Sequence, residues 1–469
     1  MKKIIISLSL LSFIVLSIIG CEDYSELTAP SIDFGSANFS RFVAIGNSLT
    51  MGEQSSSVFE AGQKYSIGNI IARQVGISYE QAILSDPGSP GRLEIEKFNI
   101  VNGSPVPVLY TNPNQGSPTN LLYPAPYNNL GIKGAFLYDV LYTTNANNCY
   151  TANFGVPNPL FDVVLRGNGT QLQQAMIQQP TLITLWIGNN DILAYATRGG
   201  LFPPTDPGVF QSQYTELLST LHTTGAQIII GSLPDGLLTP YFNTIGPQVG
   251  VGIQGIPGAQ GLVYQTTGAP GIAVASPSDL IDGTVLLTLT ASTATSYLGD
   301  TNGSYYTANG IPVPPNVNTS FPFGLTPENP FPNSLVLDPS EISIYIALRN
   351  GYNQIINTLA AQFNYYVIDW DNLFNALASP AGLDVNGIKY SSGYVTGNFF
   401  SLDGIHPTSQ GYGIVANEFI QAINSKYGAS IPHIDVSTIP GSLIFEGTVP
   451  MGKYGIPEIP CGSLDSILF

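Results

Sequence analysis

Ser48 and His406 are the residues of this chain whose neighbours could support nucleophilic chemistry. Ser48 lies on a glycine-flanked turn, Gly46–Gly52, directly after the apolar run Phe42–Ile45. His406 stands three residues after Asp403, just ahead of a helical pattern. A hydroxyl nucleophile needs a base that takes its proton, and the base needs a partner that orients it. The two segments therefore supply all three parts from opposite ends of the chain.

Each segment also has a purely structural interpretation. A Gly-x-Ser turn can simply connect a strand to a helix, and an Asp-x-x-His pair can cap a helix or form half of a metal site. The chain has only three histidines, and neither His222 nor His433 has an acid three residues before it. Asp403 and His406 alone would make a poor transition-metal site. We therefore favour a role for His406 as a base, and we expect neither a metal nor a cofactor.

Two further segments complete a recognisable set. Asn129–Gly134 is a glycine-bearing loop, and Gly188–Asp191 follows the strand-like run Thr181–Ile187. Together with the segments around Ser48 and His406, these blocks resemble, in their order along the chain, the SGNH hydrolases, also called the GDSL family of esterases and lipases. The resemblance covers the four blocks and their flanking elements but not the long stretches between them.

This resemblance implies a role for each residue. Ser48 would be the nucleophile, His406 the base, and Asp403 the residue that orients His406. The oxyanion hole would consist of the backbone N–H groups of Ser48 and Gly134 together with the side-chain amide of Asn190. Such preorganised donors usually supply the largest electrostatic stabilisation in acyl transfer.

Two positions need comment. Gly131 competes with Gly134 for the role of the loop glycine, and Gly134 is preferred because the family's glycine falls five residues after the loop's asparagine. Asn47 stands where the family usually has Asp. Asparagine is nearly isosteric with aspartate and still makes turn hydrogen bonds, so we interpret Asn47 as a tolerated variant.

The pattern of apolar residues predicts the fold class. Four apolar runs predict strands: Phe42–Ile45, Thr181–Ile187, Gln227–Ser232 and Tyr365–Trp370. Apolar residues at helical spacing predict helices over Val209–Thr223, Ser340–Phe363 and the segment after Pro407. This alternation predicts a parallel sheet covered on both faces. The resemblance narrows this to a three-layer α/β/α, flavodoxin-like SGNH hydrolase fold, in which the predicted site lies at the carboxyl ends of the strands.

The domain organisation follows from composition. We expect the hydrolase domain over residues 39–430, with Gly- and Pro-rich insertions at about 87–128 and 240–335, and a C-terminal extension over 431–469 that wraps the surface. The second insertion contains a β-like run, Thr284–Leu289, and many aromatic residues. It could be a lid or a small β subdomain that shapes substrate selection, or a surface insertion without a role.

The N-terminus indicates export. Two lysines precede an apolar run over residues 4–19, and Gly20 precedes Cys21. This is typical of a signal peptide, residues 1–20, that ends in a lipobox. An ordinary signal peptide with an incidental cysteine is the alternative. Resemblance to bacterial lipoproteins implies acylation of Cys21 and a tether over residues 21–38. Its acidic start resembles the surface-export signals of Bacteroidota lipoproteins, which predicts the outer membrane or cell surface.

The charge of the chain restricts its binding partners, and its cysteines permit one disulfide. Charged residues make up 10% of the chain, and the formal net charge is −17. Nucleic-acid binding is therefore excluded, because no basic footprint exists, and polyanionic substrates are disfavoured. Besides Cys21 the chain has Cys149 and Cys461. Export permits a disulfide between them, but two buried thiols are equally compatible with the sequence.

These observations predict a cell-envelope serine hydrolase that cleaves carboxylic esters through an acyl-enzyme. Lipid esters and acylated glycans are the candidate substrates. The alternative is a non-catalytic lipoprotein that keeps the fold to bind a glycan or lipid. The presence of Ser48, Asp403 and His406 favours the enzyme, because a pure binder has no need of all three.

Overall fold

A four-stranded parallel sheet forms the centre of the computed structural model, which describes residues 32–441 except 102–103, 125 and 269–270. The strands lie side by side in the order β1 (Phe42–Gly46), β4 (Leu182–Trp186), β5 (Gln227–Gly231) and β10 (Tyr366–Ile368). These are the four apolar runs predicted as strands. Every residue of β1 and β4 is buried, as expected for a sheet covered on both faces.

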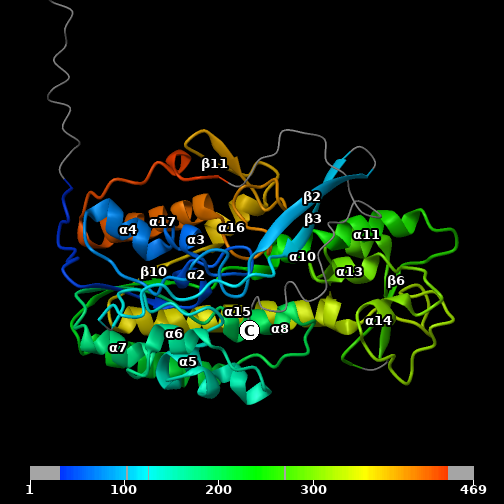
Figure 1. The fold of residues 1–469 in the computed structure, drawn as a ribbon, viewed down its shortest axis with the longest axis horizontal. Coiled ribbons are helices and arrows are strands. Elements are labelled where there is room, and N and C mark those ends of the chain that lie inside the picture. Colours follow the sequence, from blue (N-terminus) through cyan, green and yellow to red (C-terminus); the bar gives the residue numbers. More distant parts are fainter. Residues whose placement is uncertain (1–31, 102–103, 125, 269–270, 442–469) are drawn as a thin grey trace, which may run out of the picture.

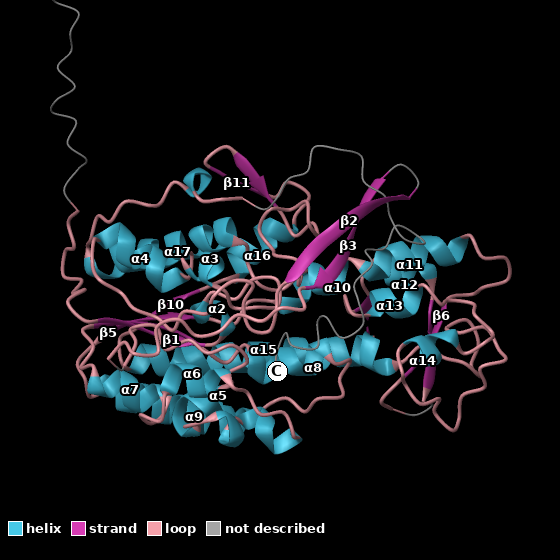
Figure 2. Cartoon of the chain, viewed as in Figure 1, coloured by secondary structure: helices cyan, strands magenta, loops and turns pink. Residues whose placement is uncertain are grey.

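Helices cover both faces of this sheet (Figure 1, Figure 2). One layer contains α4 (Ile67–Val75), α16 (Asp371–Ala378) and α17 (Ser409–Tyr427). The opposite layer contains α5 (Leu137–Tyr142), α6 (Leu160–Leu165), α7 (Gln171–Ile177), α8 (Asn190–Thr197), α9 (Pro207–His222) and α15 (Pro339–Gln362). The three predicted helices are thus α9, α15 and α17. The prediction of a mixed α/β fold around a central parallel sheet is confirmed.

The carboxyl ends of β1 and β4 bring three of the sequence blocks together. β1 leads through Asn47 into α2 (Ser48–Met51), and the Asn47 side chain accepts the Leu49 N–H at 3.1 Å. Residues 128–132 run parallel to β1, with the Leu130 N–H on the Ala44 carbonyl at 2.8 Å. α8 begins at Asn190, shortly after β4 ends. The turn, the glycine loop and the asparagine block therefore meet at one edge of the sheet.

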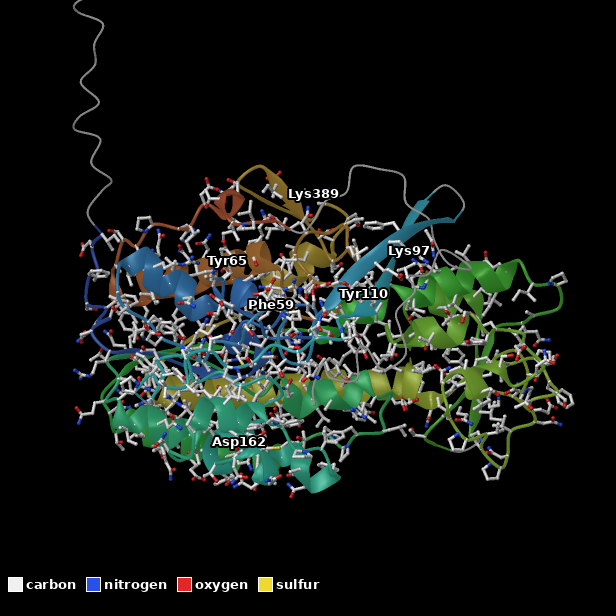
Figure 3. The ribbon with its side chains drawn as sticks, viewed as in Figure 1. Phe59, Tyr65, Lys97, Tyr110, Asp162 and Lys389 are labelled. Carbon is white, nitrogen blue, oxygen red and sulfur yellow. The ribbon has the colours of Figure 1, made fainter. Side chains whose placement is uncertain are left out.

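The two predicted insertions have regular structure. Residues 87–128 include a hairpin, β2 (Leu93–Val101) and β3 (Ser104–Thr111), in which Tyr110 donates its hydroxyl to Glu94 opposite (Figure 3). Residues 240–335 are mainly short helices with paired strands: α10 (Pro240–Asn243), α11 (Ile245–Gln254), β6 (Leu262–Gln265), β7 (Ile272–Ala275), α12 (Pro277–Ile281), β8 (Leu286–Leu287), α13 (Ala291–Thr295) and α14 (Ser304–Ala308). β8 lies within the predicted β-like run and pairs with β9 (Val336–Leu337).

The interior of the second insertion corrects one expectation. The unit lies at one end of the molecule (Figure 1) and is mixed rather than a small β subdomain. Tyr305, Phe323 and Phe331 are buried, and their rings pack against one another. They belong to the same apolar core as the central sheet. These aromatic side chains therefore stabilise the fold and do not form an open binding surface.

The remaining described elements are short. They are α3 (Glu60–Gln63), the hairpin β11 (Leu383–Val385) and β12 (Ile388–Tyr390), and single 3₁₀ turns at Ala146–Asn148, Tyr150–Phe154, Gly236–Leu238, Asn333–Leu335 and Val436–Thr438.

The described part of the segment predicted as a tether, residues 32–38, contacts the domain. Asp33 pairs with Ser430, and the Ser36 N–H donates to the Tyr427 carbonyl at 2.8 Å, so this segment is bound to the domain. Polar composition does not prevent backbone pairing, which is why the sequence was misleading here. The predicted signal peptide and Cys21 lie outside the described residues.

The described start of the predicted C-terminal extension packs against α17. Ile431, Val436 and Ile439 are buried in the same core cluster as α17. Residues 442–469, with Cys461, lie outside the described part, so its pairing with the buried Cys149 stays a prediction. Among the described residues, no helix is both long enough and apolar enough to cross a membrane.

Candidate active site

Ser48, His406 and Asp403 form a continuous series of hydrogen bonds. The Ser48 Oγ lies 2.9 Å from His406 Nε2, and His406 Nδ1 lies 3.1 Å from Asp403 Oδ2. All three side chains are buried. Residues separated by 358 positions in the chain thus come into the contact that proton transfer requires.

The loop before α17 holds Asp403 and His406 in place. Asp403 Oδ1 accepts the backbone N–H groups of Ile405 and His406, both at 2.8 Å, and Oδ2 accepts that of Ser56 at 2.7 Å. The Ser401 N–H closes the loop on the His406 carbonyl at 2.7 Å. Burial opposes ionisation of Asp403, but the neighbouring imidazole and these donors lower its pKa to about 2. Asp403 is therefore an anion across the working pH range.

The charge state of His406 depends on opposing influences. Burial lowers its pKa, whereas the carboxylates of Glu53 and Asp403 raise it, and the net result lies above the ordinary value of 6.5. A base must be neutral to accept a proton. His406 should therefore become competent only as the pH rises above that ordinary value.

The three expected oxyanion donors differ in their surroundings. Asn190 lines the same cavity as Ser48 and His406, and its amide donates one hydrogen bond to the Ala135 carbonyl at 2.9 Å. The second N–H of that amide remains available. Among the described residues, no hydrogen bond uses the N–H of Ser48 or of Gly134. Both groups are thus available as donors.

The glycine loop favours Gly134 over Gly131. The Gly131 N–H already donates to the Asn129 side chain at 2.9 Å. Gly134 has φ of +76°, a left-handed conformation that favours glycine. It is not one of the described residues that line the cavity, although it directly precedes Ala135, the partner of Asn190.

A small apolar cavity adjoins the reactive pair. Its volume is about 50 Å³, and besides Ser48, Asn190 and His406 its lining includes Trp186, Leu193, Leu233, Tyr345, Phe374 and Ile405. No described residue of the 240–335 insertion belongs to this lining. The insertion does contact the loop that carries Asp403 and His406: the Tyr241 N–H donates to the Gly404 carbonyl at 3.1 Å.

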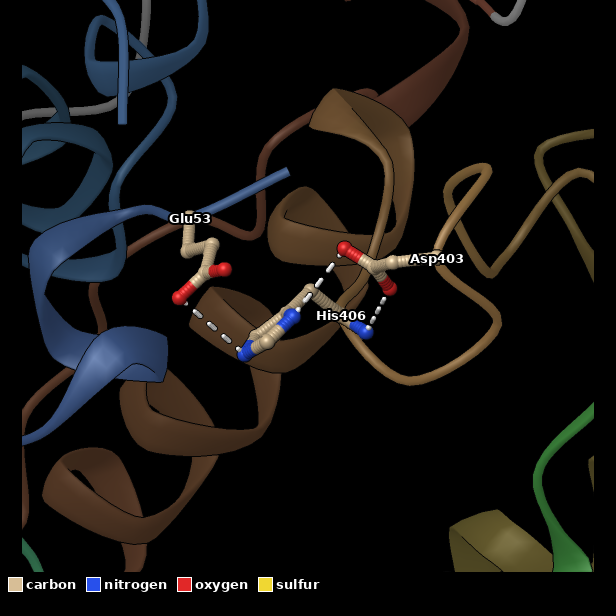
Figure 4. A group of neighbouring side chains, drawn as sticks. All are labelled: Glu53, Asp403 and His406. Atoms are coloured by element: carbon tan, nitrogen blue, oxygen red, sulfur yellow. Dashed lines mark hydrogen bonds and ion pairs between the residues drawn. The ribbon is translucent and has the colours of Figure 1, made fainter. Parts of the chain in front are cut away.

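Two charged residues at the site were missed by the sequence analysis. Glu53 is fully buried and pairs through Oε1 with the ammonium of Lys133, whose side chain is only 3% exposed. Glu53 Oε2 lies 3.5 Å from His406 Nε2, on the side of the ring opposite Asp403 (Figure 4). Glu53 directly follows the serine turn and Lys133 directly precedes Gly134. The sequence did offer a signal for them, because a charged residue adjoins each of these two motifs in a chain that has only 14 lysines and arginines.

Comparison with known proteins adds little to this geometry. No family model matches the chain, and no curated protein matches it. One solved structure with some likeness is a crystal structure of an acetyl xylan esterase. It is 14% identical, and the alignment covers 62% of this chain and 78% of that chain with a TM-score of 0.25.

Glu53, Asp403 and His406 also present one ligand atom each within 4.8 Å of one another. This donor set does not fit a metal ion. The Asp403 oxygens already accept the N–H groups described above, and Lys133 supplies the positive charge that balances Glu53. Protein groups thus already engage both Asp403 oxygens and Glu53 Oε1.

Proposed function

We propose that this protein is an SGNH-type serine hydrolase that cleaves carboxylic esters. The observation that supports the proposal is the hydrogen-bonded series of Ser48, His406 and Asp403 beside an apolar cavity. Nucleophile, base and orienting carboxylate in this order are what acyl transfer by serine requires.

Each step follows from these positions. His406 Nε2 takes the proton of Ser48 while Oγ attacks the ester carbonyl carbon. The oxyanion is held by the N–H groups of Ser48 and Gly134 and by the amide of Asn190. The C–O bond to the alcohol then breaks, and the imidazolium protonates the leaving oxygen. Water, deprotonated by His406, attacks the acyl-Ser48 ester, and collapse releases the carboxylic acid and restores Ser48.

The cavity favours a short acyl group. Its volume of about 50 Å³ is well below the roughly 150 Å³ of an engineered cavity that accepts benzene. An acetyl or similar group fits such a space better than a fatty acyl chain. Among the two substrate classes we therefore favour acylated glycans over long-chain lipid esters. A series of p-nitrophenyl esters tests this, because kcat/KM should fall as the acyl chain lengthens; a maximum at decanoate would contradict it.

Location is part of the proposal. The lipobox at Cys21 supports an exported bacterial lipoprotein, anchored in the outer membrane or at the cell surface by acyl chains. Its substrate would then lie in the envelope or outside the cell.

Ser48→Ala tests the chemistry. The variant should lose at least about a thousandfold in kcat on small esters while keeping the wild-type melting temperature. Ser292→Ala is the matched control, since it removes a buried serine hydroxyl in α13, away from the cavity. It should keep wild-type activity. A folded Ser48→Ala with wild-type turnover would refute the mechanism, and a wild type that binds esters without cleaving them would indicate the non-catalytic alternative.

A further inference from the structure

Glu53 places a carboxylate oxygen against the reactive nitrogen of His406. Its Oε1 is held by Lys133, and its Oε2 lies 3.5 Å from His406 Nε2. Among the described residues, Oε2 is buried without any hydrogen-bond partner. A buried, unsatisfied carboxylate oxygen is costly, so its retention beside Nε2 requires an explanation.

The protonation state of the ring supplies that explanation. In the neutral ring, Nε2 presents a lone pair, which accepts the Ser48 hydroxyl proton at 2.9 Å. A carboxylate oxygen facing the same lone pair gains nothing. Once the ring has taken the proton, Nε2 carries an N–H, and Glu53 Oε2 becomes an acceptor for it. As a carboxylate, Glu53 thus has a partner at Oε2 only in the imidazolium state, which is the state that the proposed reaction forms.

We propose that Glu53 is a positioning residue for His406: its Oε2 accepts the Nε2–H of the imidazolium, and Lys133 holds the carboxylate in place for that contact. This proposal rests on the proposed function, because the imidazolium forms when Ser48 gives up its proton. The proton stays on Nε2 during the contact and then passes to the leaving oxygen, so no other donor or acceptor is needed.

Lys133 links this contact to the rest of the site. Besides Glu53, its ammonium donates to the Ser56 carbonyl at 3.1 Å, and the Ser56 N–H donates to Asp403 Oδ2 at 2.7 Å. One short segment, Glu53–Ser56, therefore fixes both carboxylates that flank the imidazole. The Tyr412 hydroxyl, from α17, donates to the Glu53 carbonyl at 2.7 Å and holds the same segment from the other side.

The groups around His406 determine the direction of the expected effect. Burial lowers the pKa of His406, Glu53 and Asp403 raise it, and the positive charge of Lys133 lowers it to a lesser degree. Ser48, the hydrogen-bond partner of His406 Nε2, is a neutral group. Removing the charge of Glu53 while keeping its shape should therefore lower the pKa of His406.

The test is a titration of the histidine ring by NMR in the intact protein. Only three histidines are present, so His222→Gln and His433→Gln assign the signals. Glu53→Gln should lower the His406 titration midpoint by about one pH unit or more. Glu341→Gln is the matched control, because Glu341 is also a buried carboxylate but lies on α15 outside the cavity lining. It should leave the midpoint unchanged.

Glu53→Gln leaves the ammonium of Lys133 buried without its anion, which could prevent folding. A second variant therefore repeats the test without that unpaired charge. Glu53→Gln combined with Lys133→Met removes both charges and should also lower the midpoint, by a smaller amount. The acid limb of kcat/KM on a small ester should move to lower pH with each variant. An unchanged His406 midpoint in whichever of the two variants is folded would overturn the proposal.

This readout is independent of the proposed function. The NMR titration needs no turnover, whereas loss of activity in Ser48→Ala tests the hydrolase assignment. A shifted midpoint in a protein without esterase activity would support the contact between Glu53 and His406 and refute the hydrolase.

Discussion

At the scale of single residues, the proposed role of Asn190 depends on the orientation of its side-chain amide. In the proposed mechanism its amide donates to the oxyanion, and the hydrogen bond to the Ala135 carbonyl at 2.9 Å fixes the plane of that amide in advance. Ala135 follows Gly134, so one short stretch of backbone both orients Asn190 and presents a second donor. A preorganised donor costs no rearrangement when negative charge develops on the substrate.

Asn190→Ala should therefore lower kcat by about a hundredfold or more and change KM little, because the lost interaction forms mainly in the transition state. Steady-state kinetics on a short-chain ester measure this. Asn417→Ala serves as a control, since it removes a buried amide that bonds to Ile434 on the outer side of α17. That variant should lower stability and leave kcat unchanged. An undiminished kcat in Asn190→Ala would exclude the residue from the oxyanion hole.

At the scale of elements, Asp191 joins α8 to its neighbours. Its Oδ2 accepts the Leu137 N–H at the start of α5 at 3.0 Å, and Oδ1 accepts the Thr205 hydroxyl at 2.8 Å. The side chain is buried, and burial raises its pKa from 3.8 to about 7 in spite of these donors. The folded protein therefore binds the Asp191 proton more tightly than the unfolded chain does. This contribution to stability is complete below about pH 4 and is lost as the pH rises through 7.

Asp191→Asn removes this dependence, because an amide does not ionise. The free energy of unfolding of the variant minus that of wild type should therefore increase by roughly 2–4 kcal/mol from pH 4 to pH 8. Urea unfolding of both proteins at the two pH values measures the change. Equal differences at pH 4 and pH 8 would show that folding does not raise the pKa of Asp191.

At the scale of the whole molecule, the proposed anchor at Cys21 precedes the described residues in the chain. The segment around Asp33 is already bound to the domain through Ser430, so the acylated part of the chain must lie N-terminal to it. The formal net charge of −17 disfavours attraction of the chain to anionic lipids. Membrane association would then depend on the acyl chains alone.

Cys21→Ser should consequently move the protein from the membrane fraction to the soluble fraction, or block its processing, without changing kcat on a soluble ester. Cell fractionation followed by immunoblotting is the measurement. Cys149→Ser is the matched control, because it changes a buried cysteine inside the domain and should leave membrane association as it was. Persistent membrane association of Cys21→Ser would refute lipid anchoring at this residue.

The sequence by itself determined the features that depend on local patterns. The four central strands and helices α9, α15 and α17 could be predicted, because apolar periodicity reflects burial within each element. The serine turn and the Asp403–His406 spacing were equally visible, since turn chemistry acts over a few residues. The resemblance in block order then indicated that these segments belong to one site.

Only the tertiary structure decided which distant residues meet, because pairing and register depend on the packing of the whole chain. Glu53 and Lys133 are in contact because residues 128–132 run beside β1, and nothing in either local pattern encodes that neighbour. The same reason explains the aromatic core of the second insertion and the docking of Asp33 on Ser430. Local polarity and Gly or Pro content indicated loops there, whereas long-range contacts made them part of the folded body.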